Sequence, residues 1–261
     1  MSAAFVYALQ GEWMKKKRSL ASWVVIAGSF FTPCIVIFVR LLQHDGLRER
    51  YAGAGFWTQL WRSSWESMAI FFLPIVCVLA ASLVAQLEFK NNAWKQLHAL
   101  PLSLPAIYFS KFAVVVLMML QFFMLFNVAI YLSAVIPGIA IGGVAYPQAP
   151  IPFGLFLKEN FLYFVDCLPI VAAQYAISVR YSNFLVPVGV GFLAWIGALA
   201  ALPWKMVYLI PYSYSMLDYL KNDPSGKAAV PAFEFHWLAM AWFVFFTAAG
   251  YWFFAARPAK G

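Results

Sequence analysis

Charged residues are scarce in this chain. They make up 11% of its 261 residues, whereas apolar residues make up 64%. A soluble domain usually carries about 25% charged residues, and no polar stretch here is long enough to fold as one. The composition therefore excludes a soluble globular protein. It predicts an all-α integral membrane protein that forms a single domain over residues 1–261.

Residues that commonly bind metal ions or form disulfides are also few. The cysteines lie within apolar runs and are expected to be buried small hydrophobic residues: Cys34, Cys77 and Cys167. The histidines are far apart and lack the spacing of metal ligands: His44, His98 and His236. The sequence therefore predicts no metal site.

Motifs for nucleotide binding and catalysis are missing as well. No G-x-x-x-x-G-K-[ST] occurs, because PSGKA at 224–228 lacks the upstream glycine and the Ser or Thr. Neither H-E-x-x-H nor G-x-S-x-G occurs. Ionisable residues are sparse in the apolar runs, which argues against proton-driven or sodium-driven transport. We expect a subunit that is not an enzyme, has no cofactor of its own and draws energy from a partner.

Six apolar runs reach the length of about 20 residues that a transmembrane helix needs. They are Leu20–Leu42, Met68–Leu87, Ile107–Ile136, Phe161–Tyr181, Phe184–Leu202 and Phe235–Ala256. Only two residues separate the fourth run from the fifth, so these spans should form a tight hairpin. The first run is longer than the apolar region of a signal peptide, so we expect an uncleaved span.

The distribution of basic residues predicts the orientation. The side that holds both termini carries ten Lys and Arg residues and the other side carries eight. The block KKKR at 15–18 lies directly before the first span. Because cytoplasmic loops are enriched in Lys and Arg, both termini are expected in the cytoplasm, in a multi-pass protein of the inner (cytoplasmic) membrane. The positive charge reflects this membrane face, and no nucleic-acid partner is expected.

Two segments on the predicted outer side are rich in aromatic residues. Trp57, Trp61 and Trp65 recur every four residues and would share one face of a helix. Their expected role is an aromatic belt at the membrane interface, with a cargo contact as the alternative. Residues 203–234 combine aromatic residues with prolines that interrupt any full span, which favours re-entrant or interfacial helices.

A short cationic helix is predicted between the second and third spans. Asn92 can cap a helix over Ala93–Leu100, and Pro101 ends it. Eight residues extend about 12 Å, too little to cross a membrane. Such a helix either rests in the lipid headgroups or serves as a coupling helix that docks in a cytoplasmic ATPase.

This region resembles the coupling-helix region of type-2 ABC permeases, and in particular that of the bacteriocin and lantibiotic immunity permeases. Two further stretches are similar to that family: GEWMKKKRS at 11–19 and QYAISVRYSNFLVPVGVG at 174–191. Ala93 stands where the family pattern has Thr. The residues that carry the resemblance, and that it implies for ATPase coupling, are Glu88, Lys90, Asn91, Asn92, Trp94, Lys95, Leu97, Leu100 and Pro101.

The resemblance implies a permease with six transmembrane helices. It also implies an amphipathic N-terminal helix within 1–19, a cytoplasmic coupling region at 88–106 and re-entrant outer helices at 203–234. Two ATP-binding subunits, which bind the ATP and magnesium, would pair with this chain and a second permease chain, identical or related, among membrane lipids.

The cargo implied by the resemblance is an amphipathic or hydrophobic molecule such as a bacteriocin-type peptide. Two other classes remain open at this point: a membrane-embedded enzyme of lipid or cell-envelope metabolism, and a membrane anchor or sensor without transport.

Asp166 is the one acidic residue well inside a predicted span. A charge at that depth should face protein or a hydrated cavity rather than lipid. An ion pair with Arg40, Lys158 or Lys205 is one expectation. The other is a place on the translocation path, at its outer mouth, where Asp166 attracts cationic cargo.

Trp94→Ala is expected to weaken association with the ATP-binding subunit or to uncouple ATP hydrolysis from transport, while the chain still inserts into the membrane. Buried aromatic anchors at interfaces commonly carry about 2 kcal/mol or more. Co-purification and ATPase assays measure the two effects. If Trp94→Ala and Lys95→Glu both leave association and transport intact, the ATPase docks elsewhere.

Overall fold

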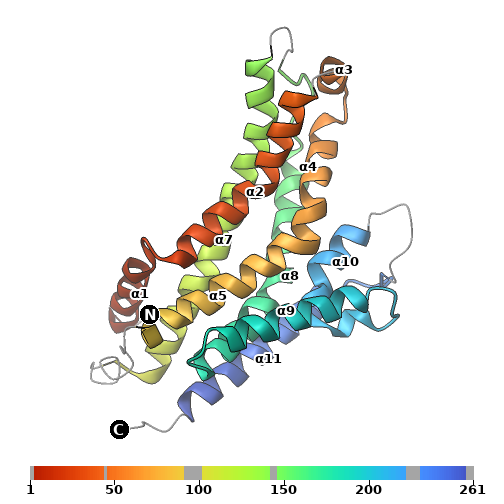
Figure 1. Cartoon of the computed structure of the whole chain (residues 1–261). Coiled ribbons are helices and arrows are strands. Elements are labelled where there is room, and N and C mark those ends of the chain that lie inside the picture. Colours follow the sequence, from red (N-terminus) through yellow and green to blue (C-terminus); the bar gives the residue numbers. More distant parts are fainter. Residues whose placement is uncertain (1–2, 44–45, 91–101, 142–145, 222–229, 257–261) are drawn as a thin grey trace.

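The computed structural model describes residues 3–43, 46–90, 102–141, 146–221 and 230–256, and every regular element in these ranges is helical (Figure 1). The long helices are α2 (Leu20–Leu42), α4 (Phe56–Ser67) continued by η1 (Met68–Phe72) and α5 (Leu73–Lys90), α7 (Leu104–Ala140), α8 (Phe153–Arg180), α9 (Leu185–Ala200) and α11 (His236–Ala255). The short ones are α1 (Ala3–Lys16), α3 (Leu47–Ala52), η2 (Val207–Leu209), η3 (Pro211–Ser213) and α10 (Tyr214–Lys221).

The bundle has two ends. Helix α1 and the last turn of α11 lie at one end, which we call the near end (Figure 1). Helices α3 and α10 lie toward the opposite, far end. Helix α8 lies at the centre of the bundle. In its most apolar stretch of 18 residues 78% are buried, against 17% in the corresponding stretch of α11. The outward faces of α2 and α11 are apolar and exposed, as expected for helices that contact lipid.

Five of the predicted spans are helices long and apolar enough to cross a membrane. The fifth predicted span, Phe184–Leu202, is the 16-residue helix α9 and falls short of the usual length. Two helices begin earlier than predicted: α8 at Phe153, and the helix through α4, η1 and α5 at Phe56. The helices continue beyond the predicted starts because one face of the added turns packs against a neighbouring helix, as Trp61 does on Phe156.

The continuous helix from α4 to α5 contains a wider turn, the π-helical η1. Pro74 follows it and has no backbone N–H, so the carbonyl of Ile70 lacks its usual helical donor. The indole of Trp195 on α9 donates to this carbonyl at 2.9 Å. The hydroxyl of Ser215 on α10 donates to the neighbouring carbonyl of Ala69, also at 2.9 Å. Side chains of α9 and α10 therefore supply the hydrogen-bond donors that these two backbone carbonyls lack within their own helix. The membrane interior requires such partners because it offers no water.

Gln174 ties α8 to three other elements inside the bundle. Its amide donates to the hydroxyl of Ser82 on α5 at 3.1 Å and to the carbonyl of Pro187 on α9. Its carbonyl oxygen accepts a hydrogen bond of 3.0 Å from the hydroxyl of Tyr212 on η3. All of these groups are buried. The hairpin of α8 and α9 and the segment before α10 are thus held at one polar point.

Helices α8 and α11 approach each other closely at Gly250. A Cβ atom built there would lie 2.7 Å from the Cβ of Ala176 on α8 and would also meet the hydroxyl of Tyr108 on α7. That hydroxyl donates to the carbonyl of Thr247 at 3.2 Å. Small residues allow helix backbones in membranes to come this close.

Gly250→Val should therefore separate α11 from α8 and destabilise the chain. Overpacking of this kind costs about 1–3 kcal/mol, which thermal unfolding of the detergent-solubilised protein can measure. Gly197→Val on α9 is the matched control, because a Cβ there meets nothing within 4 Å. Equal melting temperatures for the two variants would show that the α8–α11 contact is looser than the structure has it.

Candidate functional site

The predicted coupling region lies at the near end, between α5 and α7. Glu88 and Lys90 fall in the last turn of α5. The other seven predicted coupling residues, at 91–101, lie outside the described residues. Helix α7 begins after Ser103, whose hydroxyl accepts a hydrogen bond from the backbone N–H of Ala106 at 3.4 Å. The structure therefore describes the two helices that hold this region, and the coupling role itself stays a prediction.

Charged side chains fix α1 against α7 at the near end. The carboxylate of Glu12 lies 2.6 Å from the ammonium of Lys111 on α7 and 2.6 Å from that of Lys15. Lys16 donates to the amide oxygen of Gln121 at 2.8 Å. Burial alone would raise the pKa of Glu12, but the charges of Lys111 and Lys15 outweigh it and hold this pKa below its ordinary value of 4.5.

The two faces of α1 differ in character. The side toward α7 buries Glu12 and Lys16, whereas Val6, Tyr7 and Met14 are exposed. A helix of a soluble protein shows the reverse arrangement. Helix α1 lies within residues 1–19, where the amphipathic helix was predicted, and its exposed apolar residues suit contact with lipid.

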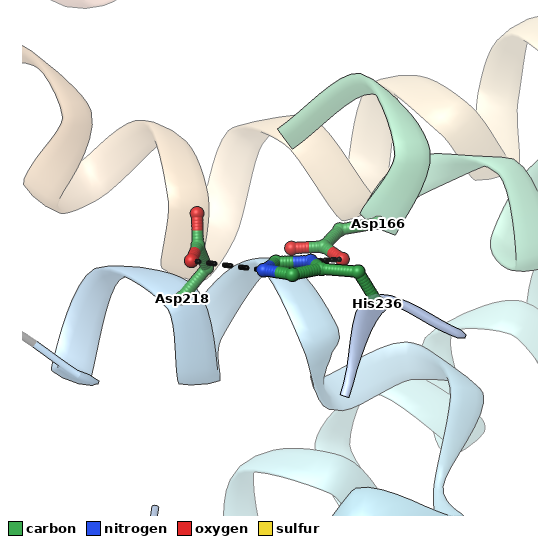
Figure 2. Close-up of side chains that lie close together, drawn as sticks. All are labelled: Asp166, Asp218 and His236. Atoms are coloured by element: carbon green, nitrogen blue, oxygen red, sulfur yellow. Dashed lines mark hydrogen bonds and ion pairs between the residues drawn. The ribbon is translucent and has the colours of Figure 1, made fainter. Parts of the chain in front are cut away.

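At the far end three ionisable side chains from three helices come together (Figure 2). Asp166 on α8 lies 2.8 Å from Nδ1 of His236, the first residue of α11. Nε2 of the same imidazole lies 3.7 Å from Asp218 on α10 and 3.6 Å from Glu234. Asp166 and Asp218 are 0% and 3% exposed. Burial, and then the charge of Asp166, raise the pKa of Asp218 to about 7.

The partner of Asp166 differs from the expected one. An imidazole that lies 70 residues away takes the place of Arg40, Lys158 or Lys205. The guanidinium of Arg40 instead donates to the carbonyl of Ser133 at 3.1 Å. Sequence spacing could not have found His236 or Asp218, because each lies on a different helix. The only signal was their position beside aromatic and proline-rich residues that already indicated a packed outer segment.

A groove opens between α4, α7 and α8, with a volume of about 820 Å³. Its polar floor is a pair of amides, Asn127 on α7 and Asn160 on α8, which exchange hydrogen bonds of 2.9 and 3.0 Å. None of its lining residues is charged; they are Trp57, Trp61, Leu120, Phe123, Met124, Asn127, Val128, Ile130, Tyr131, Tyr146, Ile151, Phe153, Phe156, Leu157, Asn160, Phe161 and Phe164. Such a surface suits an apolar or amphipathic molecule.

The tryptophan stripe on α4 packs inside the bundle. Trp57, Trp61 and Trp65 are all buried. Trp61 stacks on Phe156 with 4.3 Å between ring centroids, and Trp65 stacks on Tyr163 with 3.8 Å. A belt in the headgroups would leave these rings exposed, so that interpretation is wrong. Trp57 and Trp61 line the groove, so the alternative, a contact with cargo, stays a prediction for these two residues.

Comparison with known protein families finds a match. Residues 8–198, more than half of the chain, match the family described as ABC-2 family transporter protein. None of the curated proteins compared with the chain matches it.

Glu12→Gln should loosen α1 from α7, because it removes the negative charge that balances the buried Lys111. Loss of one partner from a buried pair costs about 3 kcal/mol. Lys15→Ala is the matched control: Lys15 is 43% exposed, and an exposed pair contributes about 1 kcal/mol or less. Thermal unfolding of both variants gives the comparison.

The same variant should depend on pH. The pKa of Glu12 is lower in the folded chain, so its contribution is complete above the ordinary value of 4.5 and is lost as the pH falls through the folded value. The difference between wild type and Glu12→Gln should therefore shrink below about pH 4. A difference that stays undiminished as the pH falls well below about 4 would contradict the charge pairing.

Proposed function

Because the chain belongs to the ABC-2 family of transporter membrane proteins, we propose that it is the permease of an ATP-driven exporter for an amphipathic or hydrophobic molecule, such as a bacteriocin-type peptide. Family membership makes it a multi-pass membrane subunit of an ABC transporter, and such subunits associate with an ABC ATP-binding subunit. The direction of transport and the cargo are the parts that we propose.

The groove is the observation that supports this cargo. Met124 and Leu157 line it and are each 71% exposed, so the groove is open along the outer surface of α7 and α8. A molecule dissolved in the bilayer can therefore reach it sideways without crossing a charged surface. Its volume falls in the usual range of about 300–1,000 Å³ for sites that bind small molecules. It accommodates a few large apolar side chains, and the paired amides can accept or donate to a polar group of the cargo.

The energy for export would come from the partner. In this proposal two ATP-binding subunits bind the ATP and magnesium and dock on residues 88–106 at the near end. A second permease chain, identical or related, completes the transporter. The near end faces the cytoplasm of a cell whose inner membrane holds the chain. The dense KKKR block beside α2 supports this orientation.

Asp166 belongs to this proposal only in another conformation. It is fully buried and bonded to His236, so it does not contact the groove or solvent here. A role for Asp166 on the translocation path requires α10 and α11 to move away from α8 during the transport cycle.

Met124→Trp should fill the groove and reduce export. We expect cargo-stimulated ATP hydrolysis of the complex with its ATP-binding subunit to fall at least several-fold, with basal hydrolysis unchanged, because a larger ring occupies the space that cargo needs. A cationic amphipathic peptide serves as the probe, and both rates are measured in lipid nanodiscs.

Leu193→Trp is the matched control for this experiment. Leu193 lies on α9, away from the groove, and is also 71% exposed. The Leu193→Trp variant introduces the same indole ring at a position that is as exposed as Met124. If both variants reduce stimulation equally, or if neither does, the groove does not bind the cargo.

A further inference from the structure

Buried polar atoms of the far-end cluster have no hydrogen-bond partner. Nε2 of His236 faces the carboxylates of Asp218 and Glu234 at 3.7 and 3.6 Å. Both distances exceed those of a normal hydrogen bond, and Nε2 has no hydrogen-bond partner. Oδ2 of Asp218 is also buried without a partner. A buried polar atom without a partner costs free energy. The unpartnered atoms of His236 and Asp218 therefore indicate a ligand that binds between them.

The distances match those between ligands of one metal ion. Zinc binds imidazole nitrogen and carboxylate oxygen at about 2.0–2.2 Å in tetrahedral geometry. Two ligand atoms of the same ion are then about 3.4 Å apart, which follows from those bond lengths. Nε2 of His236 lies 3.7 Å from Oδ1 of Asp218 and 3.6 Å from Oε2 of Glu234, within a few tenths of an ångström of that separation. The Glu234 side chain is 64% exposed, so it can swing toward Asp218 to complete the ligand set.

Asp166 holds the imidazole in the orientation that such an ion needs. Its Oδ1 lies 2.8 Å from Nδ1 of His236. When Nδ1 carries the hydrogen and donates it to Asp166, the lone pair of Nε2 points toward Asp218 and Glu234. Histidines that bind metals usually donate their other ring N–H to a carboxylate in this way.

The local charge also favours a cation. Asp166, Asp218 and Glu234 bring three carboxylates around one imidazole, and Glu159 adds its negative charge near Asp218. Lys221 lies 3.0 Å from Oε1 of Glu234, which leaves Oε2 directed at the imidazole. The charge of Lys221 also acts on Asp166 and Asp218, and a divalent ion would neutralise the negative charge that one lysine leaves uncompensated.

We propose that His236, Asp218 and Glu234 bind a divalent transition-metal ion, for which zinc is the best match, and that Asp166 is the positioning residue for His236. A mixed set of imidazole and carboxylate ligands suits zinc better than magnesium or calcium, which prefer oxygen alone. The ion would join α10 to α11 and hold the segment before α11 against the bundle, and Asp166 would connect this site to α8 through His236. It would thereby stabilise the packing of α10 and α11 at the far end.

Zinc binding by the full-length chain tests this proposal. The chain is purified in detergent with a histidine-free affinity tag, equilibrated with buffered zinc and assayed for bound metal by mass spectrometry. We expect one zinc per chain. Thermal unfolding should occur at a lower temperature after treatment with EDTA and recover when zinc is added.

Variants separate the ligands from the positioning residue. His236→Asn keeps a donor for Asp166 but lacks Nε2, and Asp218→Asn removes a ligand charge; each should weaken zinc binding at least about tenfold. Asp166→Asn should weaken it by about 10–100-fold through the imidazole, and it should alter the visible spectrum of the cobalt-substituted chain. The side chain of Glu234 is 64% exposed. The Glu234→Gln variant should therefore fold normally and still bind zinc less tightly.

Glu49→Gln is the control, because Glu49 is an exposed acid of α3 away from the cluster. It should bind zinc as the wild type does. The proposal is overturned if the wild type binds no more zinc than His236→Asn. It is also overturned if EDTA leaves the melting temperature unchanged while Asp218→Asn lowers it, since the cluster would then be an ion pair without metal.

Discussion

Polar side chains on α8 must find partners inside an apolar bundle, and this requirement determines which helices lie beside it. An unsatisfied polar group in hydrocarbon costs several kcal/mol. Along α8, Asn160 pairs with α7, Asp166 pairs with α11, and Gln174 bonds to α5, α9 and η3. Apolar packing alone would permit α8 to rotate or slide against its neighbours. The polar partners fix both its rotation and its depth.

Much of the helical arrangement could be predicted because a span leaves a long apolar run in the sequence. The prediction Leu20–Leu42 agrees with α2 at both ends. The predicted start of α8 lies eight residues too late, and the turns missed include the polar residues Lys158, Glu159 and Asn160. Asn160 is tolerated in the helix because it pairs with Asn127 on α7. One sequence without relatives gives no signal of that contact.

The candidate sites also differ in whether the sequence could predict them. The coupling region could be predicted because its residues are consecutive and resemble a family pattern, and its role stays a prediction. The far-end cluster was missed because Asp166, Asp218 and His236 come from three helices, and only tertiary packing brings them together. The tryptophan stripe was recognised from its spacing, but spacing cannot tell a face that meets headgroups from one that packs on Phe156 and Tyr163.

One continuous helix links these features. From Phe56 to Lys90 it runs about 50 Å at 1.5 Å per residue, from the groove at Trp57 and Trp61 to the start of the coupling region. Its π-helical turn lies between the two, and such turns occur frequently at functional sites. In the proposed exporter, a push on the near end would reach the groove through this helix.

The most direct test of the exporter is ATP-dependent transport by the chain reconstituted in liposomes with its ATP-binding subunit. With ATP outside, complexes whose near end faces outward should accumulate a fluorescent amphipathic peptide in the lumen, and vesicles that lack either subunit should not. Accumulation that needs no ATP, or that proceeds equally without this chain, would contradict the account.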